Sequence, residues 1–113
     1  MKKINITVSG GLGRMGSLLI KKTLQDKMLN LSSVTEQQEQ KKNGVQYKKN
    51  SIHSLKNTNV IIDFTRPHCT SEILKIATKL KKKIVIGTTG FNKKQQNEIN
   101  QASKKLLFCN QEI

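Results

Sequence analysis

The sequence predicts an α/β protein with a doubly wound parallel sheet and helices on both of its faces. Two short apolar runs, at 60–64 and 84–86, are typical of strands that are buried on both sides. Segments with the 3.6-residue periodicity of amphipathic helices alternate with such runs along the chain. Repeated strand–helix units of this kind favour a parallel sheet, because each helix returns the chain to the same end of the sheet.

The first half of the chain supplies the weaker signals. Ile4–Val8 is a short β-rich run that ends at a pair of glycines. In the helix that follows, Met15, Leu18, Leu19, Ile20 and Leu24 are expected to form one broad apolar face. The elements expected here are a strand at 4–8, a helix at 13–27, a strand at 29–34, a polar, mobile loop at 36–44, a short strand at 45–47 and a helical turn at 51–56.

The second half is more regular. A strand at 60–64 leads to a helix that Pro67 opens, where proline suits the first turn. The apolar residues of that helix follow the i, i+3, i+4, i+7 spacing, and they are Ile73, Ile76, Ala77 and Leu80. A strand at 84–86 comes next, then a helix at 93–104 with Asn92 as its N-cap, and a last strand at 106–108.

Length and composition limit the classes of function. The 113 residues suffice for one domain, which we expect to span 1–113. The net charge of +14 comes from 19 Lys spread along the chain and only two Arg, so we expect no nucleic-acid partner. No apolar stretch is long enough to span a membrane. Cys69 and Cys109 are expected to be reduced thiols in a cytoplasmic protein, with no metal bound.

Three glycines carry the first functional signal. Gly10, Gly13 and Gly16 are spaced by three and stand where the first strand gives way to the first helix. The free N–H groups and the dipole of a helix N-terminus favour an anion there, and a Cβ would block the approach of a pyrophosphate. The motif predicts a Rossmann-like, dinucleotide-binding domain, and a tight turn without a ligand is the alternative.

An acidic residue stands at the matching interval. Glu36 lies 20 residues beyond Gly16, at the end of the second predicted strand, where a carboxylate would accept hydrogen bonds from the adenosine ribose. An exposed loop glutamate is the alternative. Gln37 carries no charge and Glu36 would repel a 2′-phosphate, so NADH is expected to be preferred over NADPH, with Lys41 and Lys42 as partial compensation for the latter.

Two further turns lie at predicted carboxyl ends of strands. Gly87, Thr88 and Thr89 follow the strand at 84–86, and their small side chains and N–H groups suit the nicotinamide end of the cofactor. A plain Gly/Thr turn is the alternative. Arg66 follows the strand at 60–64 and is a candidate anion contact.

The runs GGLGRMG (10–16), VIIDFTRP (60–67) and VIGTTGF (85–91) resemble those of 4-hydroxy-tetrahydrodipicolinate reductases. The resemblance extends to about Phe108. It implies that the pyrophosphate is wrapped by Gly10, Gly11, Leu12, Gly13, Arg14 and Met15. It also implies that Glu36 holds the ribose and that Gly87, Thr88 and Thr89 contact the nicotinamide side. The family reaction would pass a hydride from NADH or NADPH to a cyclic imine-type dicarboxylate, with loss of water, in lysine and diaminopimelate biosynthesis.

The chain departs from the family after the strand at 106–108. The resemblance implies a hinge and a C-terminal α+β domain there, with a His-rich catalytic motif, the dicarboxylate site and the contacts of a homotetramer. This sequence ends at Ile113, and His53 and His68 lie in other segments. We therefore expect a domain truncated near the hinge, without catalytic residues and inactive alone. The alternatives are a free-standing or vestigial dinucleotide-binding module and, less favoured, a basic nucleic-acid-binding domain.

Overall fold

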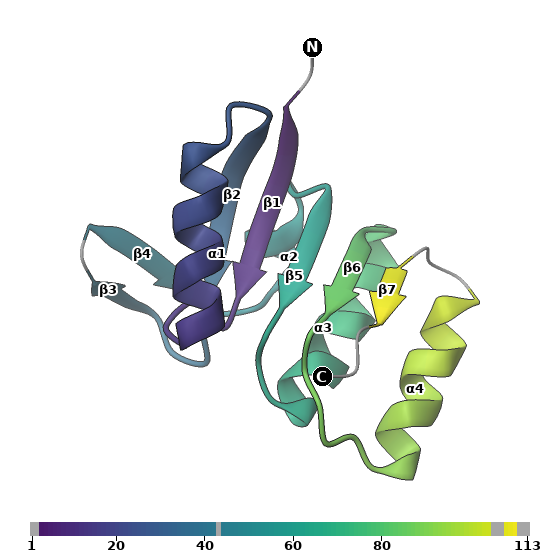
Figure 1. Cartoon of the computed structure of the whole chain (residues 1–113). Coiled ribbons are helices and arrows are strands. Elements are labelled where there is room, and N and C mark those ends of the chain that lie inside the picture. Colours follow the sequence, from purple (N-terminus) through teal and green to yellow (C-terminus); the bar gives the residue numbers. More distant parts are fainter. Residues whose placement is uncertain (1–2, 43, 105–107, 111–113) are drawn as a thin grey trace.

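The structure of the chain is a computed structural model that describes residues 3–42, 44–104 and 108–110. Strands and helices alternate along most of its length (Figure 1). The elements are β1 (Ile4–Ser9), α1 (Arg14–Gln25), β2 (Leu29–Thr35), β3 (Gln40–Lys42), β4 (Val45–Lys48), α2 (Ile52–Leu55), β5 (Val60–Asp63), α3 (Pro67–Leu80), β6 (Lys83–Ile86), α4 (Lys93–Ser103) and β7 (Phe108–Asn110).

The strands form one sheet in the order β3-β4-β2-β1-β5-β6-β7. All neighbours are parallel except β3 and β4, which pair as an antiparallel hairpin. From β1 the chain moves outward to β2 and β4, and then crosses to β5 on the other side of β1. This reversal confirms the doubly wound sheet, and it creates the switch point at which open α/β sheets bind ligands.

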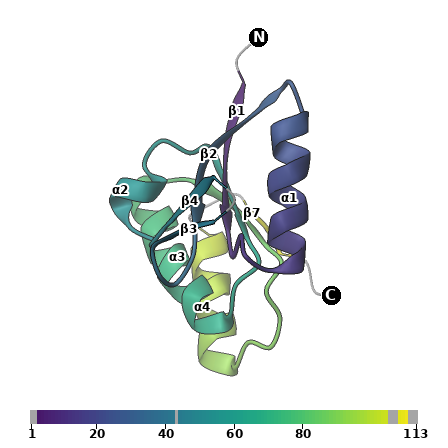
Figure 2. The same ribbon diagram turned by 90° about the vertical axis from the view of Figure 1, so that its left-hand side faces the viewer.

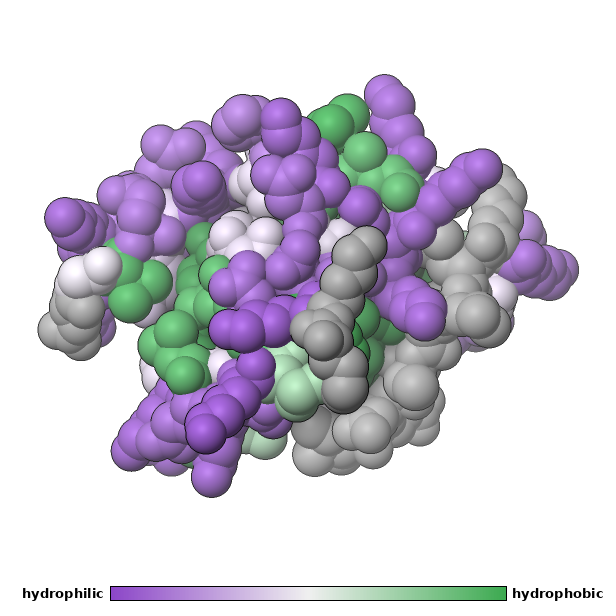
Figure 3. Space-filling view, turned by 90° about the horizontal axis from the view of Figure 1, so that it is seen from above, coloured by the Kyte–Doolittle hydropathy of each residue, from purple (hydrophilic) through white to green (hydrophobic). Residues whose placement is uncertain are grey.

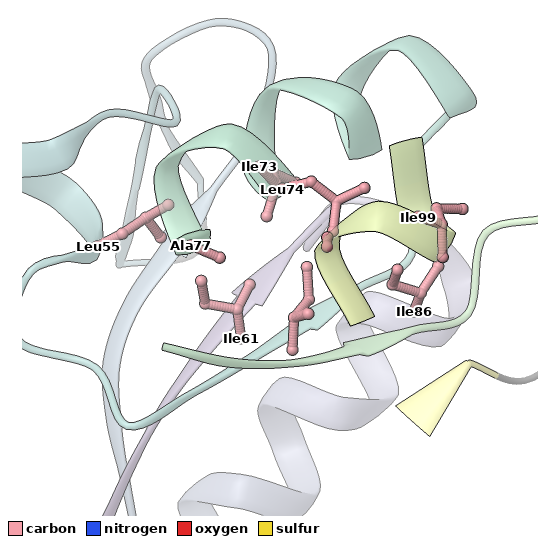
Figure 4. Packing of buried hydrophobic residues seen from close by; sticks show 9 residues of the cluster. Leu55, Ile61, Ile73, Leu74, Ala77, Ile86 and Ile99 are labelled. Carbon is pink, nitrogen blue, oxygen red and sulfur yellow. The ribbon is translucent and has the colours of Figure 1, made fainter. Parts of the chain in front are cut away.

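The helices cover both faces of the sheet. Figure 2 shows α1 on one face and α2, α3 and α4 on the other. Each face has its own apolar core. The core under α3 and α4 is drawn in Figure 4, and it consists of Leu55, Ile61, Ile73, Leu74, Ala77, Ile84, Ile86, Ile99 and Ala102. The core under α1 consists of Ile6, Val8, Ile20, Val34 and Tyr47. The expected helices on both faces are therefore confirmed.

The central strand β5 contributes to both cores. Ile61 is fully buried in the core under α3, whereas Val60 and Ile62 pack against the core under α1. This alternation explains why the run reads as continuously apolar in the sequence. The helix that follows buries Ile73 and Ala77, as its periodicity predicts.

The expected apolar face of α1 is wrong in part. Met15, Leu18 and Leu24 are 46%, 48% and 65% exposed, and the buried residues of this helix include Gly16 and Thr23. Gly16 is buried because the helix begins directly on the glycine loop. Thr23 can be buried because its hydroxyl donates to the Leu19 carbonyl at 2.7 Å.

Two boundaries also differ from expectation. The segment 36–44, expected to be a mobile loop, contains the edge strand β3, which forms through main-chain pairing with β4 and needs no apolar side chains. Gly44 follows with a positive φ of 78°. Of the strand expected at 106–108, residues 106 and 107 lie outside the described part of the chain, and β7 begins at Phe108.

Figure 3 shows the molecule from above the view of Figure 1, at the end where β1 begins, and hydrophilic side chains cover much of this face with some apolar groups between them. Within the described ranges, no helix has the length and apolar character needed to cross a bilayer. The opposite end of the sheet, at the bottom of Figure 1, carries the predicted site.

Candidate functional site

A cleft lies at the carboxyl ends of β1, β2 and β5. It has a volume of about 320 Å³ and is lined by Gly10, Gly13, Glu36, Gln37, Asn50, Phe64, Thr65, Arg66 and Cys69. An adjoining cavity of about 350 Å³ shares four of these residues and adds Lys49, His68 and Glu72. Both volumes fall in the range of small-molecule sites. The cleft therefore occupies the switch point that the strand order creates.

The start of α1 is suited to an anion. Gly13 is the N-cap, in an extended conformation, and no side chain caps the helix. The first turn contains no acidic residue. The first N–H groups of a helix have no intrahelical partner, and together with the helix dipole they attract negative charge. The cleft thus receives an uncapped, electropositive helix end.

The glycines of the loop have different reasons to be glycine. A Cβ on Gly16 would lie 2.1 Å from the Gly10 carbonyl oxygen, and one on Gly11 would lie 2.4 Å from a Val34 methyl carbon. Gly10 has a φ of 85°, and its Cβ would lie 2.5 Å from the Phe64 carbonyl oxygen. Packing within the protein accounts for these three.

Gly13 differs from them. The nearest atom to its hypothetical Cβ is the Gly10 carbonyl oxygen at 3.5 Å, an ordinary contact. Gly13 is exposed and lines the cleft. A Cβ at this position would meet no close protein atom, so packing within the protein does not account for a glycine here.

Glu36 is held against the same loop. It follows β2, and its N–H donates to the Lys48 carbonyl at 2.8 Å. The Leu12 N–H donates to its Oε2, also at 2.8 Å. The carboxylate has further acceptor capacity and lines both cavities. Glu36 is therefore a half-buried, fixed acceptor and not a free loop glutamate.

The side chains beside Glu36 are mostly ones that the sequence patterns did not single out for the site. The Gln37 amide nitrogen lies 3.4 Å from both His68 Nε2 and Cys69 Sγ. Lys49 lines the same cavity, whereas Lys41 and Lys42 line neither cavity. Lys41 and Lys42, the residues suggested as compensation for a 2′-phosphate, both lie on the edge strand β3, and that suggestion stays a prediction.

Gly87, Thr88 and Thr89 line neither the cleft nor the adjoining cavity. Gly87 and Thr88 are buried and Thr89 is exposed. A Cβ on Gly87 would lie 2.2 Å from the ring of Phe64, which does line the cleft. Of the other predicted contacts, Arg66 lines the cleft, whereas Arg14 and Met15 are exposed in the first turn of α1 and do not.

The cysteines give no metal site in the described part of the chain. Cys69 is buried and free, and its Sγ lies 3.4 Å from His68 Nε2. No group of three potential ligand side chains comes together within the described ranges. The side chain of Cys109 lies outside what the structure describes.

Sequence reasoning missed Asp63, the last residue of β5. It is fully buried. Burial raises the pKa of its carboxyl group above the ordinary value of 3.8, whereas the hydrogen bonds from Thr65 and Thr70 and the nearby hydroxyl of Thr88 lower that pKa again. The available signal was a lone acid inside an otherwise apolar strand, a residue type that is seldom fully buried.

The raised pKa gives a prediction about stability. A group whose pKa is higher in the folded state stabilises the fold most below its unfolded pKa, and this contribution is lost as the pH rises through the folded pKa. The side-chain amide of an Asp63→Asn variant cannot titrate. We therefore expect the free energy of unfolding of the unaltered chain, minus that of Asp63→Asn, to fall as the pH is raised from about 4, near the unfolded pKa, towards neutrality. Urea titrations across this range measure it, and a rising difference would contradict the burial effect.

Three features define a Rossmann-like nucleotide-binding domain: a largely parallel sheet with this strand order, a glycine loop at an uncapped helix, and an acidic residue after the second strand. The family model described as dihydrodipicolinate reductase, N-terminus, matches residues 4–110. The chain belongs to the dihydrodipicolinate reductase family and corresponds to its N-terminal nucleotide-binding domain.

Individual relatives agree with this membership. The chain is 50% identical over 108 residues to the 4-hydroxy-tetrahydrodipicolinate reductase of Pelagibacter ubique, in a match that covers 94% of this chain and 42% of the relative. It is 39% identical over 118 residues to the enzyme of that name from Buchnera aphidicola subsp. Cinara cedri, covering 92% and 43%. The chain therefore spans less than half the length of these relatives.

Solved structures show the same fold. A dipicolinate-bound dihydrodipicolinate reductase from Paenisporosarcina sp. TG-14 superposes with a TM-score of 0.71 at 21% identity, over 89% of this chain and 43% of that one. Homoserine dehydrogenase of S. aureus gives a TM-score of 0.70 at 19% identity, over 98% and 33%. At these identities the likeness concerns the fold alone.

Proposed function

We propose that this chain binds a nicotinamide dinucleotide at the carboxyl ends of β1, β2 and β5, as the cofactor domain of a 4-hydroxy-tetrahydrodipicolinate reductase. The observation that carries the proposal is the pairing of Gly13 with Glu36 around one loop. The open glycine at the uncapped helix suits a phosphate, and the carboxylate beside it suits ribose hydroxyls. A dinucleotide presents both groups.

The proposed contacts are those that the sequence motifs predict. Residues 10–15 hold the pyrophosphate, and Arg66, which also lines the cleft, adds positive charge. Glu36 accepts from the adenosine ribose. Gly87, Thr88 and Thr89 receive the nicotinamide end, next to Phe64. When bound, the cofactor supplies a hydride, and the residues of this chain bind and orient it.

The reaction that we assign to the whole family protein is reduction of a cyclic imine-type dicarboxylate in lysine and diaminopimelate biosynthesis, in the cytoplasm. The matched region is 42% to 43% of the relatives' length. We assign dicarboxylate binding and assembly into a tetramer to the part of those proteins outside the matched region.

NADH is expected to bind more tightly than NADPH. Glu36 would lie against the 2′-phosphate of NADPH, and its neighbour Gln37 has no charge to offset the repulsion. Lys49 and His68 line the adjoining cavity and reduce the penalty without removing it, so we expect a preference of about tenfold. Calorimetric titration with both ligands, at moderate salt because the chain carries +14, measures this preference.

Glu36→Gln is the matched control for this preference, because it keeps the size of the side chain and removes its charge. The variant is expected to bind NADH more weakly and to show a smaller difference in affinity between NADH and NADPH. Higher affinity of the unaltered chain for NADPH than for NADH would contradict the assigned preference. Failure of both ligands to bind would contradict the proposed function.

A further inference from the structure

The carboxylate of Asp63 is immobilised at the end of β5. It accepts hydrogen bonds from the Thr65 N–H, at 3.0 Å, and from the hydroxyls of Thr65 and Thr70. A buried carboxylate is tolerated only when such donors surround it. The contacts proposed for nucleotide binding do not include this carboxylate.

The partners of Asp63 come from three elements. Thr65 belongs to the turn after β5, and Thr70 belongs to α3. The main-chain carbonyl of Asp63 accepts from the Gly87 N–H at 2.8 Å, in the loop that follows β6. Asp63 is thus hydrogen-bonded to each of the segments around the proposed site of the nicotinamide end.

Phe64 packs closely against two glycines, Gly10 in the first loop and Gly87 in the loop after β6. It lies between Asp63 and Thr65, whose hydrogen bond closes a local turn around it. Its ring occupies the space that a Cβ of Gly87 would need, and its carbonyl oxygen does the same at Gly10. The turn that Asp63 fixes therefore sets the spacing between the pyrophosphate loop and the loop after β6.

The Thr88 hydroxyl adds an independent observation. Thr88 is 5% exposed, and its Oγ1 is the one buried side-chain nitrogen or oxygen, among the residues the structure describes, that has no hydrogen-bond partner. It lies beside the Asp63 carboxylate, where it favours the charged form, yet makes no hydrogen bond to it. Buried polar groups in native proteins are nearly always paired with protein, water or ligand atoms, so this hydroxyl is available to donate to a group that enters the site.

We propose that Asp63 is a positioning residue for the nicotinamide end of the cofactor. Through Thr65 and Thr70 it holds Phe64 and the segment Gly87–Thr89 in the geometry that receives the ring, and it keeps the Thr88 hydroxyl at that site. This role rests on the proposed function, because it presumes that a nicotinamide dinucleotide occupies the cleft.

The test compares NADH with ADP-ribose, which has the adenosine, the pyrophosphate and the second ribose but no nicotinamide. Dissociation constants for both are measured calorimetrically with the 113-residue chain and with Asp63→Asn and Thr70→Val, each checked by circular dichroism. In both variants the dissociation constant is expected to rise about tenfold for NADH and less than about twofold for ADP-ribose.

Thr58→Val is the matched control. Thr58 is also buried and hydrogen-bonded, to the carbonyls of Asn5 and Val60, but it lies at the opposite end of β5. The change is expected to lower the melting temperature and to leave the ratio of the two dissociation constants unchanged. That ratio responds to positioning of the nicotinamide and not to a general loss of stability.

Equal weakening of both ligands by Thr70→Val, or no weakening of NADH, would overturn the role of Asp63, and Thr70→Val decides the matter even if Asp63→Asn does not fold. Equal affinity of the unaltered chain for NADH and ADP-ribose would overturn it as well, while leaving the proposed dinucleotide site in place. Binding of neither ligand to the unaltered chain would refute the proposed function and this role with it.

Discussion

Gly13→Val is expected to abolish NADH binding while the chain keeps its fold. The Cβ position of Gly13 is open, with the nearest protein atom at 3.5 Å, and its φ of −74° suits any residue. The branched side chain would project into the cleft and keep a pyrophosphate away from the N–H groups of the first turn of α1. We expect the dissociation constant for NADH to rise at least about a hundredfold, which corresponds to about 2.7 kcal/mol.

Gly16→Ala serves as the control, because it is expected to lower the stability of the fold, whereas Gly13→Val is not. Its Cβ would lie 2.1 Å from the Gly10 carbonyl oxygen, so even one methyl group forces the loop and the helix apart. We expect a lower melting temperature for Gly16→Ala and an unchanged one for Gly13→Val, by circular dichroism. A folded Gly13→Val chain with unchanged affinity for NADH would show that the glycine motif is only a turn.

The 113-residue chain alone is expected to show no reductase turnover. A hydride acceptor has to be held close to the nicotinamide, and a positioned acid has to deliver a proton. In the described part of the chain, Asp63 is buried, Glu36 is held by Leu12, and Glu72 lines the adjoining cavity but not the cleft. Orientation is worth about 10⁵ to 10⁸ in effective molarity and acid catalysis about 10² to 10⁴ in rate, so their loss silences the reaction.

The assay follows NADH oxidation with freshly generated substrate and purified chain. No rate above background is expected, and activity should return when the remaining part of a family protein is added as a separate polypeptide. If the chain alone turns over substrate and Gly13→Val removes that turnover, the catalytic residues lie in this domain and not in the remaining part of the family protein.

The order of the elements could be predicted from the sequence because the signals for it are local. The buried strand β5 and the helix from Pro67 are marked by apolar periodicity, and Asn92 forms the predicted cap of α4 as a capping box with Gln95. The edge strand β3 escaped prediction because its stability comes from main-chain pairing with β4, which polar side chains do not reveal.

The site could be predicted only in part, because the contacts that define it join segments that are distant in the sequence. Glycine spacing locates the loop, but it does not separate Gly13, which faces the cleft, from Gly16, which packs against Gly10. That distinction depends on how the loop folds back on its own helix. The role of Asp63 likewise depends on Thr70 and Gly87, which lie 7 and 24 positions further along the chain and meet it only in the folded sheet.

Amide chemical shifts of the isotope-labelled chain, recorded during titration with NADH, locate the bound nucleotide directly. We expect saturable shifts for residues 10–16, for Glu36 and for residues 64–66, with smaller ones at 87–89 that ADP-ribose does not reproduce. A separate cavity, of about 410 Å³ between α3 and α4, is lined by Leu74, Glu98 and Ala102 among others and serves as the internal comparison. Shifts confined to that cavity, or no saturable shift at the glycine loop, would contradict a dinucleotide site at the carboxyl ends of β1, β2 and β5.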